Sequence, residues 1–201
     1  LRICNNGDYA SKNPIPEEVA KKIPSNVKLV YWDYYHTEEQ IYRDMIDAHG
    51  SVKEGMWFAG GSWVWSGFAP NIEWSFRTTE PALKVCNERG VENIIMTLWG
   101  DFGRECSCFS ALSMLYHAIQ TYKGNNDMQS IKDGFNQLIG EDFEDFALLE
   151  IPNQVNGNVG TYHNPSKYML YNDPFMGIFD HNVRGGEAEY YKKQKCKLSK
   201  A

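Results

Sequence analysis

The sequence has 201 residues, 42% of them hydrophobic, and a formal net charge of -6 at pH 7. This length and hydrophobic content predict one ordinary folded core, with or without an appendage, and exclude a disordered tail. The acidic balance provides no basic surface for phosphate groups, so neither nucleic acid nor a membrane is an expected partner. No apolar run reaches the ~18 residues of a membrane span, and no signal peptide pattern is visible.

The five cysteines form an odd set without the regular spacing of a secreted disulfide scaffold. We therefore expect reduced thiols in a cytoplasmic protein. Cys106 and Cys108 have no second cysteine pair or histidine cluster nearby, so neither a metal site nor any other cofactor is expected. The chain starts at Leu1 rather than at a methionine, which suggests a piece of a longer protein.

Three apolar or aromatic runs between residues 26 and 101 are each followed by a polar loop and a helical pattern. The runs are Val27–Tyr35, Met56–Trp65 and Asn93–Trp99. We expect the second helix to begin around Thr79 and Pro81, because proline favours the first turn of a helix. This repeated rhythm predicts an α/β fold with parallel strands.

No glycine-rich phosphate loop follows any of these runs, which disfavours a doubly wound nucleotide-binding fold. We predict instead about three β/α units, forming the C-terminal part of a (β/α)8 TIM barrel in residues 1–123. Residues 124–201 are expected to form a small helical appendage. Its first helix is predicted to be capped by Asp127 and ended by Gly140.

Aromatic residues gather at the ends of the three predicted strands. The chain has six tryptophans and 14% aromatic residues. Large rings either pack in a core or offer flat apolar faces to sugar rings. Because barrels build their sites where strands end, the second use is favoured here. The residues at these strand ends, where a barrel builds its site, include Asp33, Tyr35, Trp63, Trp65, Trp99 and Asp101.

Three segments carry a resemblance to a known family. They are VYWDYY at residues 30–35, FAGGSWVWSGFAP at 58–70 and TLWGDFGREC at 97–106. Together they resemble the last three strand ends of the β-N-acetylhexosaminidases of glycoside hydrolase family 20, especially a bacterial branch of exo-acting β-N-acetylglucosaminidases with a helical C-terminal domain. The resemblance implies removal of terminal β-linked N-acetylhexosamine by retaining catalysis, in which the substrate's own acetamide is the nucleophile.

The resemblance also implies roles for individual residues. Trp99 resembles the floor under the apolar face of the sugar, and Asp101 the carboxylate that binds the 4- and 6-hydroxyls. Trp32 resembles the wall around the acetamide methyl, and Trp63 or Trp65 the aromatic residues of strand seven. A fixed carboxylate that accepts two hydroxyl donors would discriminate between epimers.

In the wider family, strand seven supplies a tyrosine for the acetamide oxygen, whereas this chain has Trp63-Val64-Trp65 there. The hydroxyl could come from Tyr34 or Tyr35, with Asp33 beside them, and the sequence leaves this choice open. Glu105 either orients the pocket or meets the N-terminus of the following helix.

The family's catalytic Asp-Glu dipeptide occurs nowhere in this chain. We therefore expect no catalytic residue here, with the acid and its orienting Asp upstream, and we predict that the fragment is inactive alone. It is expected to associate with the missing N-terminal half of the barrel or with itself. Two alternatives stay open: a non-catalytic carbohydrate-binding module, and a different barrel glycosidase that uses Asp33 and Asp101 as its carboxylate pair.

Overall fold

The computed structural model describes residues 2–4, 16–50, 55–100, 107–124, 127–155, 165–183 and 185–199. These residues belong to two compact units. The first unit comprises 1–61, 76–97 and 117–126, and the second comprises 62–75, 98–116 and 127–201. Of the predicted site residues, Asp101 and Glu105 lie outside the described residues.

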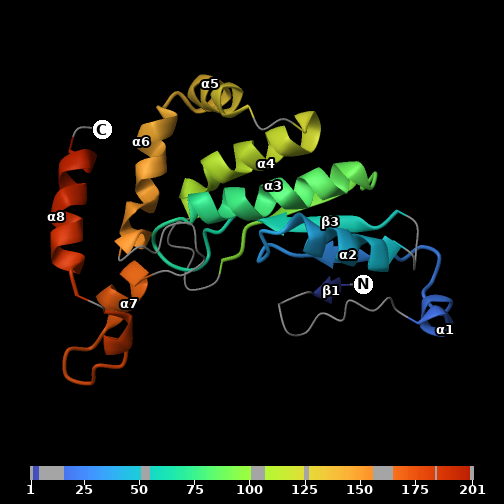
Figure 1. Cartoon of the computed structure of the whole chain (residues 1–201), viewed down its shortest axis with the longest axis horizontal. Coiled ribbons are helices and arrows are strands. Elements are labelled where there is room, and N and C mark those ends of the chain that lie inside the picture. The colour runs from blue at the N-terminus through green and yellow to red at the C-terminus, as the bar shows by residue number, and fades with distance from the viewer. Residues whose placement is uncertain are drawn as a thin grey trace. The chain divides into compact units, whose positions relative to one another are not determined.

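The first unit contains a four-stranded parallel sheet whose strands follow one another in chain order (Figure 1). The strands are β1 (Arg2–Cys4), β2 (Val30–Trp32), β3 (Trp57–Gly61) and β4 (Asn93–Thr97). The α/β class and the last three strands confirm the prediction from the sequence. The sequence did not predict β1, because three residues are too few to show a strand periodicity.

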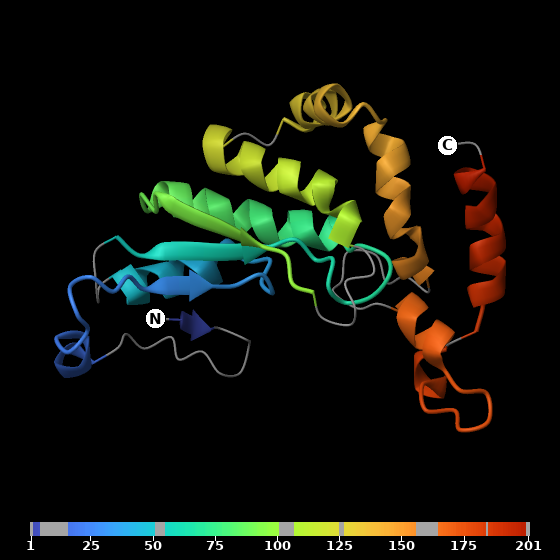
Figure 2. The same ribbon diagram turned by 180° about the vertical axis from the view of Figure 1, so that it is seen from behind.

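Two helices cover one face of this sheet. They are α2 (Glu39–Gly50) and α3 (Ile72–Glu88), and Figure 2 shows them from behind. Tyr31 of β2 and Phe58 of β3 are buried in one apolar cluster with Tyr42 of α2 and Leu83 of α3. Since side chains alternate along a strand, the neighbouring residue Trp32 points to the opposite face of the sheet.

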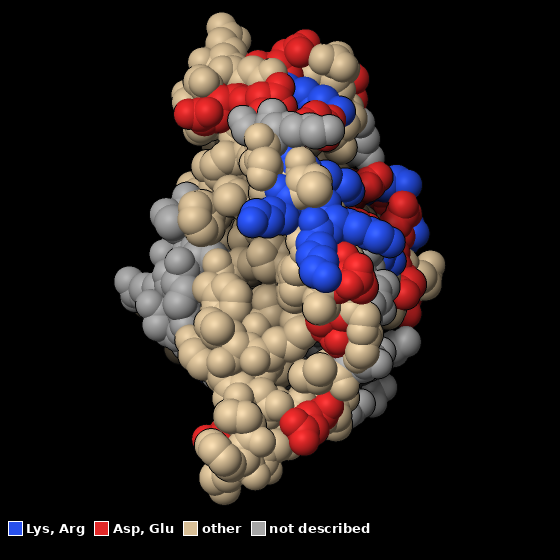
Figure 3. All heavy atoms as spheres, turned by 90° about the vertical axis from the view of Figure 1, so that its left-hand side faces the viewer, with Lys and Arg blue, Asp and Glu red and all other residues tan. Residues whose placement is uncertain are grey.

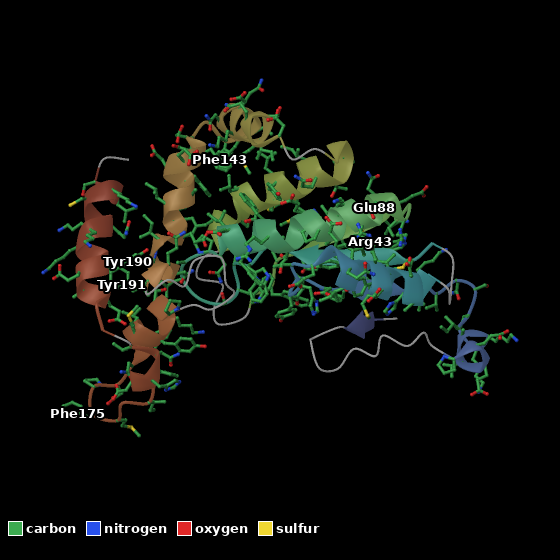
Figure 4. All side chains as sticks on the ribbon, in the orientation of Figure 1. Arg43, Glu88, Phe143, Phe175, Tyr190 and Tyr191 are labelled. Atoms are coloured by element: carbon green, nitrogen blue, oxygen red, sulfur yellow. The ribbon has the colours of Figure 1, made fainter. Side chains whose placement is uncertain are left out.

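The two covering helices are also joined at their surface. Arg43 of α2 donates from Nε to Glu88 of α3 at 3.1 Å, and it also binds Glu39 one turn away (Figure 4). Lys84 of α3 binds the same Glu39 at 2.6 Å. Exposed ion pairs of this kind contribute little to stability, so the buried cluster provides most of the cohesion of this layer.

The start of α3 differs from the prediction. The helix begins at Ile72 rather than near Thr79, and Pro81 lies inside it. After β4 come two helical elements, the 3-10 helix η3 (Ser107–Ser110) and then α4 (Ala111–Lys123). A short helix, α1 (Glu17–Ala20), precedes β2.

The second unit includes the helical C-terminal part of the chain. Asp127 caps α5 (Met128–Ile139) by accepting from the backbone N–H of Gln129 at 3.1 Å, and Gly140 ends the helix with a φ of 83°. Both signals were predicted from the sequence, and both are confirmed. Phe135 of α5 meets Phe143 edge to face, with ring centroids 6.0 Å apart. The further elements are α6 (Phe143–Ala147), η4 (Leu148–Asn153), α7 (Pro165–Tyr171), η6 (Asp180–Asn182) and α8 (Glu187–Leu198).

The last helix, α8, has its charges arranged to suit its own dipole. Glu187 and Glu189 lie in its first turn, and Lys195 and Lys197 lie in its last turn. Negative charge near the N-terminus and positive charge near the C-terminus stabilise a helix. On the face that Figure 3 draws, Lys and Arg side chains gather in one patch. In the part of the chain that the structure describes, no helix is long and apolar enough to cross a membrane.

Candidate functional site

The carboxyl ends of β2, β3 and β4 share one edge of the sheet, because the strands are parallel and adjacent. The predicted site residues follow these ends along the chain. Trp32 is the last residue of β2, Trp63 is the second residue after β3, and Trp99 is the second residue after β4.

Asp33 is the centre of a buried hydrogen-bond cluster in the first unit. Its carboxylate accepts from the Tyr31 hydroxyl at 2.6 Å and from the backbone N–H of Tyr35 at 2.9 Å, and it binds His36 Nδ1 at 2.7 Å. The residue is only 1% exposed. A buried carboxylate needs such partners, because burial without them is costly. Asp33 therefore fixes the chain that follows β2.

His36 and Tyr31 are members of this cluster that the sequence did not select as site residues. His36 keeps partial exposure, and its carbonyl accepts from the buried hydroxyl of Tyr42 at 2.8 Å. Burial is the main reason why the pKa of Tyr42 lies well above its usual value, so this phenol stays a proton donor. The spacing of Tyr31 and Asp33 was a usable signal, since residues two apart in a strand share a face.

Tyr34 and Tyr35 differ in exposure. Tyr34 is 8% exposed and lines a narrow recess with Asp33, Gly60 and His117. Tyr35 keeps partial exposure, and its ring centroid lies 4.9 Å from that of Tyr34. The sequence left open which of the two tyrosines supplies the hydroxyl for the acetamide oxygen, and Tyr35 is the more accessible of them.

His117 closes that recess as a neutral imidazole. Its side chain is buried, and burial lowers its pKa from 6.5 to about 4. Among the described residues, its Nε2 has no hydrogen-bond partner. The same nitrogen lies 3.2 Å from the place where a Cβ on Gly60 would be, so glycine at this position makes room for the ring.

Trp63 and Trp65 lie in the second unit, in the segment after β3. Their ring centroids are 4.5 Å apart with an interplanar angle of 33°, and Trp63 meets Trp74 edge to face at 6.4 Å. Trp63 is 3% exposed and Trp65 is 5% exposed. The structure therefore brings these predicted residues together as a packed aromatic wall, with little surface left open on either ring.

Trp32 and Trp99 are the predicted tryptophans that keep partial exposure. In each, the indole nitrogen is buried while part of the side chain remains accessible. Partial exposure is what a ring needs in order to stack on a sugar. Within the described residues, no group of three or more His, Cys, Asp or Glu side chains could hold a metal ion.

Comparison with known protein families adds evidence from the other end of the chain. Residues 144–201 match the family described as Glycoside Hydrolase 20C C-terminal domain. This match supports a glycoside hydrolase family 20 member with its C-terminal domain. The matched residues lie outside the strand-end segments, so this match confirms the family resemblance from a separate part of the sequence. No curated protein matches the chain in a sequence search.

The match also places part of the second unit in the family 20 C-terminal domain. Most of α6, all of η4, α7 and α8, and the connections between them fall within residues 144–201. Glu150 and Asn153 of η4, both buried, therefore belong to this domain.

Proposed function

We propose that this family 20 chain is the sugar-recognising, C-terminal part of an exo-acting β-N-acetylhexosaminidase. The enzyme would remove terminal β-linked N-acetylhexosamine by retaining, substrate-assisted catalysis. The observation that carries this proposal is the combination of the C-terminal domain match with aromatic and acidic residues at three consecutive parallel strand ends. A site on a shared scaffold has to be argued from such residues, because fold alone does not specify chemistry.

The order of the strands supports a barrel. A doubly wound sheet reverses its strand order and has helices on both faces, whereas a barrel adds each strand next to the previous one with its helices outside. Here the order is β1-β2-β3-β4, and α2 and α3 cover the same face. We propose that residues 1–123 are a barrel sector, that residues 124–201 form the helical domain, and that the free edges pair with the rest of the barrel.

We assign sugar contacts first to the candidates that keep exposed surface. Trp99 and Trp32 would contact the apolar face and the acetamide group, and Tyr35 would supply the hydroxyl for the acetamide oxygen. Trp63 and Trp65 would supply the aromatic wall that follows β3. Asp33 would orient Tyr35 and His36, since both of its carboxylate oxygens are already bound.

The remaining roles rest on the family resemblance. Asp101 would accept from the 4- and 6-hydroxyls, and Glu105 would orient the pocket. The catalytic Asp-Glu pair would come from a segment outside this sequence, because the chain contains no such dipeptide. We therefore propose that the chain alone binds the sugar but does not cleave it.

Sugar binding by the chain tests this proposal. N-acetylglucosamine, N-acetylgalactosamine and glucose are titrated against the chain and against the variants Trp99→Ala and Trp57→Ala, with binding followed by calorimetry. Trp57 is the matched control, since it is a partly buried tryptophan at the opposite, amino end of β3. We expect selective binding of an N-acetylated sugar that Trp99→Ala weakens at least ~10-fold and Trp57→Ala does not. Equal binding of glucose would contradict the proposal.

A further inference from the structure

The segment 62–71, which joins β3 to α3, will be called the tryptophan loop because it carries Trp63 and Trp65. Its base is closed by two hydrogen bonds that backbone N–H groups donate. The N–H of Asn71 donates to the carbonyl of Trp63 at 2.8 Å, and the N–H of Trp63 donates to Ser75 Oγ at 2.9 Å. The conformation of Trp63 thus depends on where Asn71 is held.

Asn153, from the family 20 C-terminal domain, holds this part of the loop. Its Nδ2 donates to the carbonyl oxygens of Ala69 at 2.9 Å and Pro70 at 3.0 Å, and it lies 3.2 Å from Asn71 Oδ1. On its other side, Asn153 Oδ1 accepts from Ser166 Oγ at 2.9 Å. Asn153 is 1% exposed, so these bonds replace water that cannot reach the group.

The turn that carries Asn153 is itself fixed from two directions. Glu150 is buried and accepts from the backbone N–H of Glu73 at 2.7 Å, in the first turn of α3. From α8, the hydroxyls of Tyr190 and Tyr191 donate to the carbonyls of Ile151 at 2.9 Å and Pro152 at 3.1 Å (Figure 4). A side chain held this firmly can impose a conformation on the segment that it binds.

We propose that Asn153 is a positioning residue for the sugar site. The C-terminal domain, through this one amide, sets the conformation of the tryptophan loop and with it the aromatic wall of Trp63 and Trp65. The effect on sugar binding rests on the proposed function above, whereas the effect on loop conformation does not. The domain would therefore act on substrate affinity without contacting the substrate.

The first part of the test measures loop stability by amide hydrogen exchange in the full chain. Asn153→Asp keeps the side-chain shape and the acceptor for Ser166, but it replaces the donor with an oxygen that faces two carbonyls. Ser199→Ala is the control, because it removes one hydrogen bond from α8 in the same domain and leaves the turn that carries Asn153 in place. We expect the amides of Trp63 and Asn71 to exchange about ten-fold faster in Asn153→Asp, with no such change in the control.

The α5 amides report whether the whole C-terminal domain has loosened, and they are expected to exchange at the wild-type rate in both variants. If Asn153→Asp does not fold, Asn153→Ser, which keeps a hydroxyl donor, is measured instead. We again expect the amides of Trp63 and Asn71 to exchange faster than in the wild type, by a smaller factor. Loop amides that exchange at the wild-type rate in the variant that folds would overturn the proposal.

The second part measures kinetics in the enzyme that contains this chain, on a chromogenic N-acetyl-β-glucosaminide. A positioning role predicts that Asn153→Asp raises KM about ten-fold while kcat stays within about two-fold, and that Ser199→Ala changes neither. An unchanged KM together with a loosened loop would overturn the link to the sugar. Failure of the proposed function is seen separately, as a wild-type enzyme that does not hydrolyse this substrate.

Discussion

His117 Nε2 occupies the space beside Gly60, 3.2 Å from the position that a Cβ on this glycine would take. The Phe58 ring is equally close on another side. We predict that Gly60→Ala destabilises the first unit by ~1–3 kcal/mol, because neither neighbour has room to move in a packed interior. Urea unfolding measures this loss, and adding His117→Ala should recover part of it.

Gly50→Ala is the control for that substitution. A Cβ at Gly50, at the end of α2, would meet nothing within 4 Å. We expect its unfolding free energy to stay within ~0.5 kcal/mol of the wild type. Equal losses for Gly60→Ala and Gly50→Ala would mean that contact with His117 does not determine the choice of glycine.

Acid should weaken the first unit through His117. Burial lowers the pKa of this imidazole from 6.5 to about 4, so the unfolded chain takes up a proton at a higher pH than the folded chain. The stabilisation is complete above pH 6.5 and is lost as the pH falls towards 4, by an amount on the order of 3 kcal/mol. In His117→Gln this part of the pH dependence should disappear from urea unfolding. A variant that parallels the wild type between pH 4 and 6.5 would exclude His117 as the cause.

Glu150 should have the opposite effect. Burial raises the pKa of its carboxyl from 4.5 to about 7, so the folded chain holds a proton that the unfolded chain releases. Stability is greatest below pH 4.5 and falls as the pH rises to 7, by a few kcal/mol at most. Glu150→Gln can still accept from the N–H of Glu73 but cannot ionise. We expect its melting temperature relative to the wild type to rise between pH 4.5 and 7, whereas a constant difference would contradict the assignment.

Tyr31 and Tyr42 offer a matched pair of hydroxyl deletions. The Tyr31 hydroxyl donates to the Asp33 carboxylate at 2.6 Å, whereas the Tyr42 hydroxyl donates to the neutral carbonyl of His36 at 2.8 Å. Both rings are fully buried. Hydrogen bonds to charged groups contribute more, so Tyr31→Phe should cost ~1.5–3 kcal/mol and Tyr42→Phe ~1 kcal/mol. A larger loss for Tyr42→Phe in urea unfolding would show that Asp33 does not depend on Tyr31.

Local signals in the sequence were sufficient for some elements and misleading for one. The caps of α5 were predictable because Asp127 and Gly140 act within one turn of the helix. The predicted start of α3 was wrong because the N–H of Glu73, in the first turn of the helix, is bound by Glu150, 77 residues away along the chain. A cap supplied by a distant residue leaves no local pattern in the sequence. Pro81 is a sign of a first turn, but it lies inside the helix.

In the candidate site, too, some features could be predicted from local sequence and others depend on tertiary contacts. Residue types at the strand ends predicted an aromatic, acidic site, since strand ends are recognisable from apolar runs. Burial was not predictable, because it depends on what packs against each ring. Trp63 and Trp65 are packed against one another, and Asp33 is enclosed by its donors. The role of Asn153 was hidden for the same reason, since its partners in the tryptophan loop lie more than eighty residues away along the chain.

Hydrolysis of a chromogenic N-acetyl-β-glucosaminide, by the chain alone and after mixing with the remainder of the barrel, tests the central claim most directly. We predict no hydrolysis by the chain alone and hydrolysis on mixing, with the catalytic acid supplied by the added part. Hydrolysis by the chain alone would contradict this and return attention to Asp33, Asp101 and Glu105. No hydrolysis in either case, with sugar binding retained, would contradict the hydrolase and favour a carbohydrate-binding module.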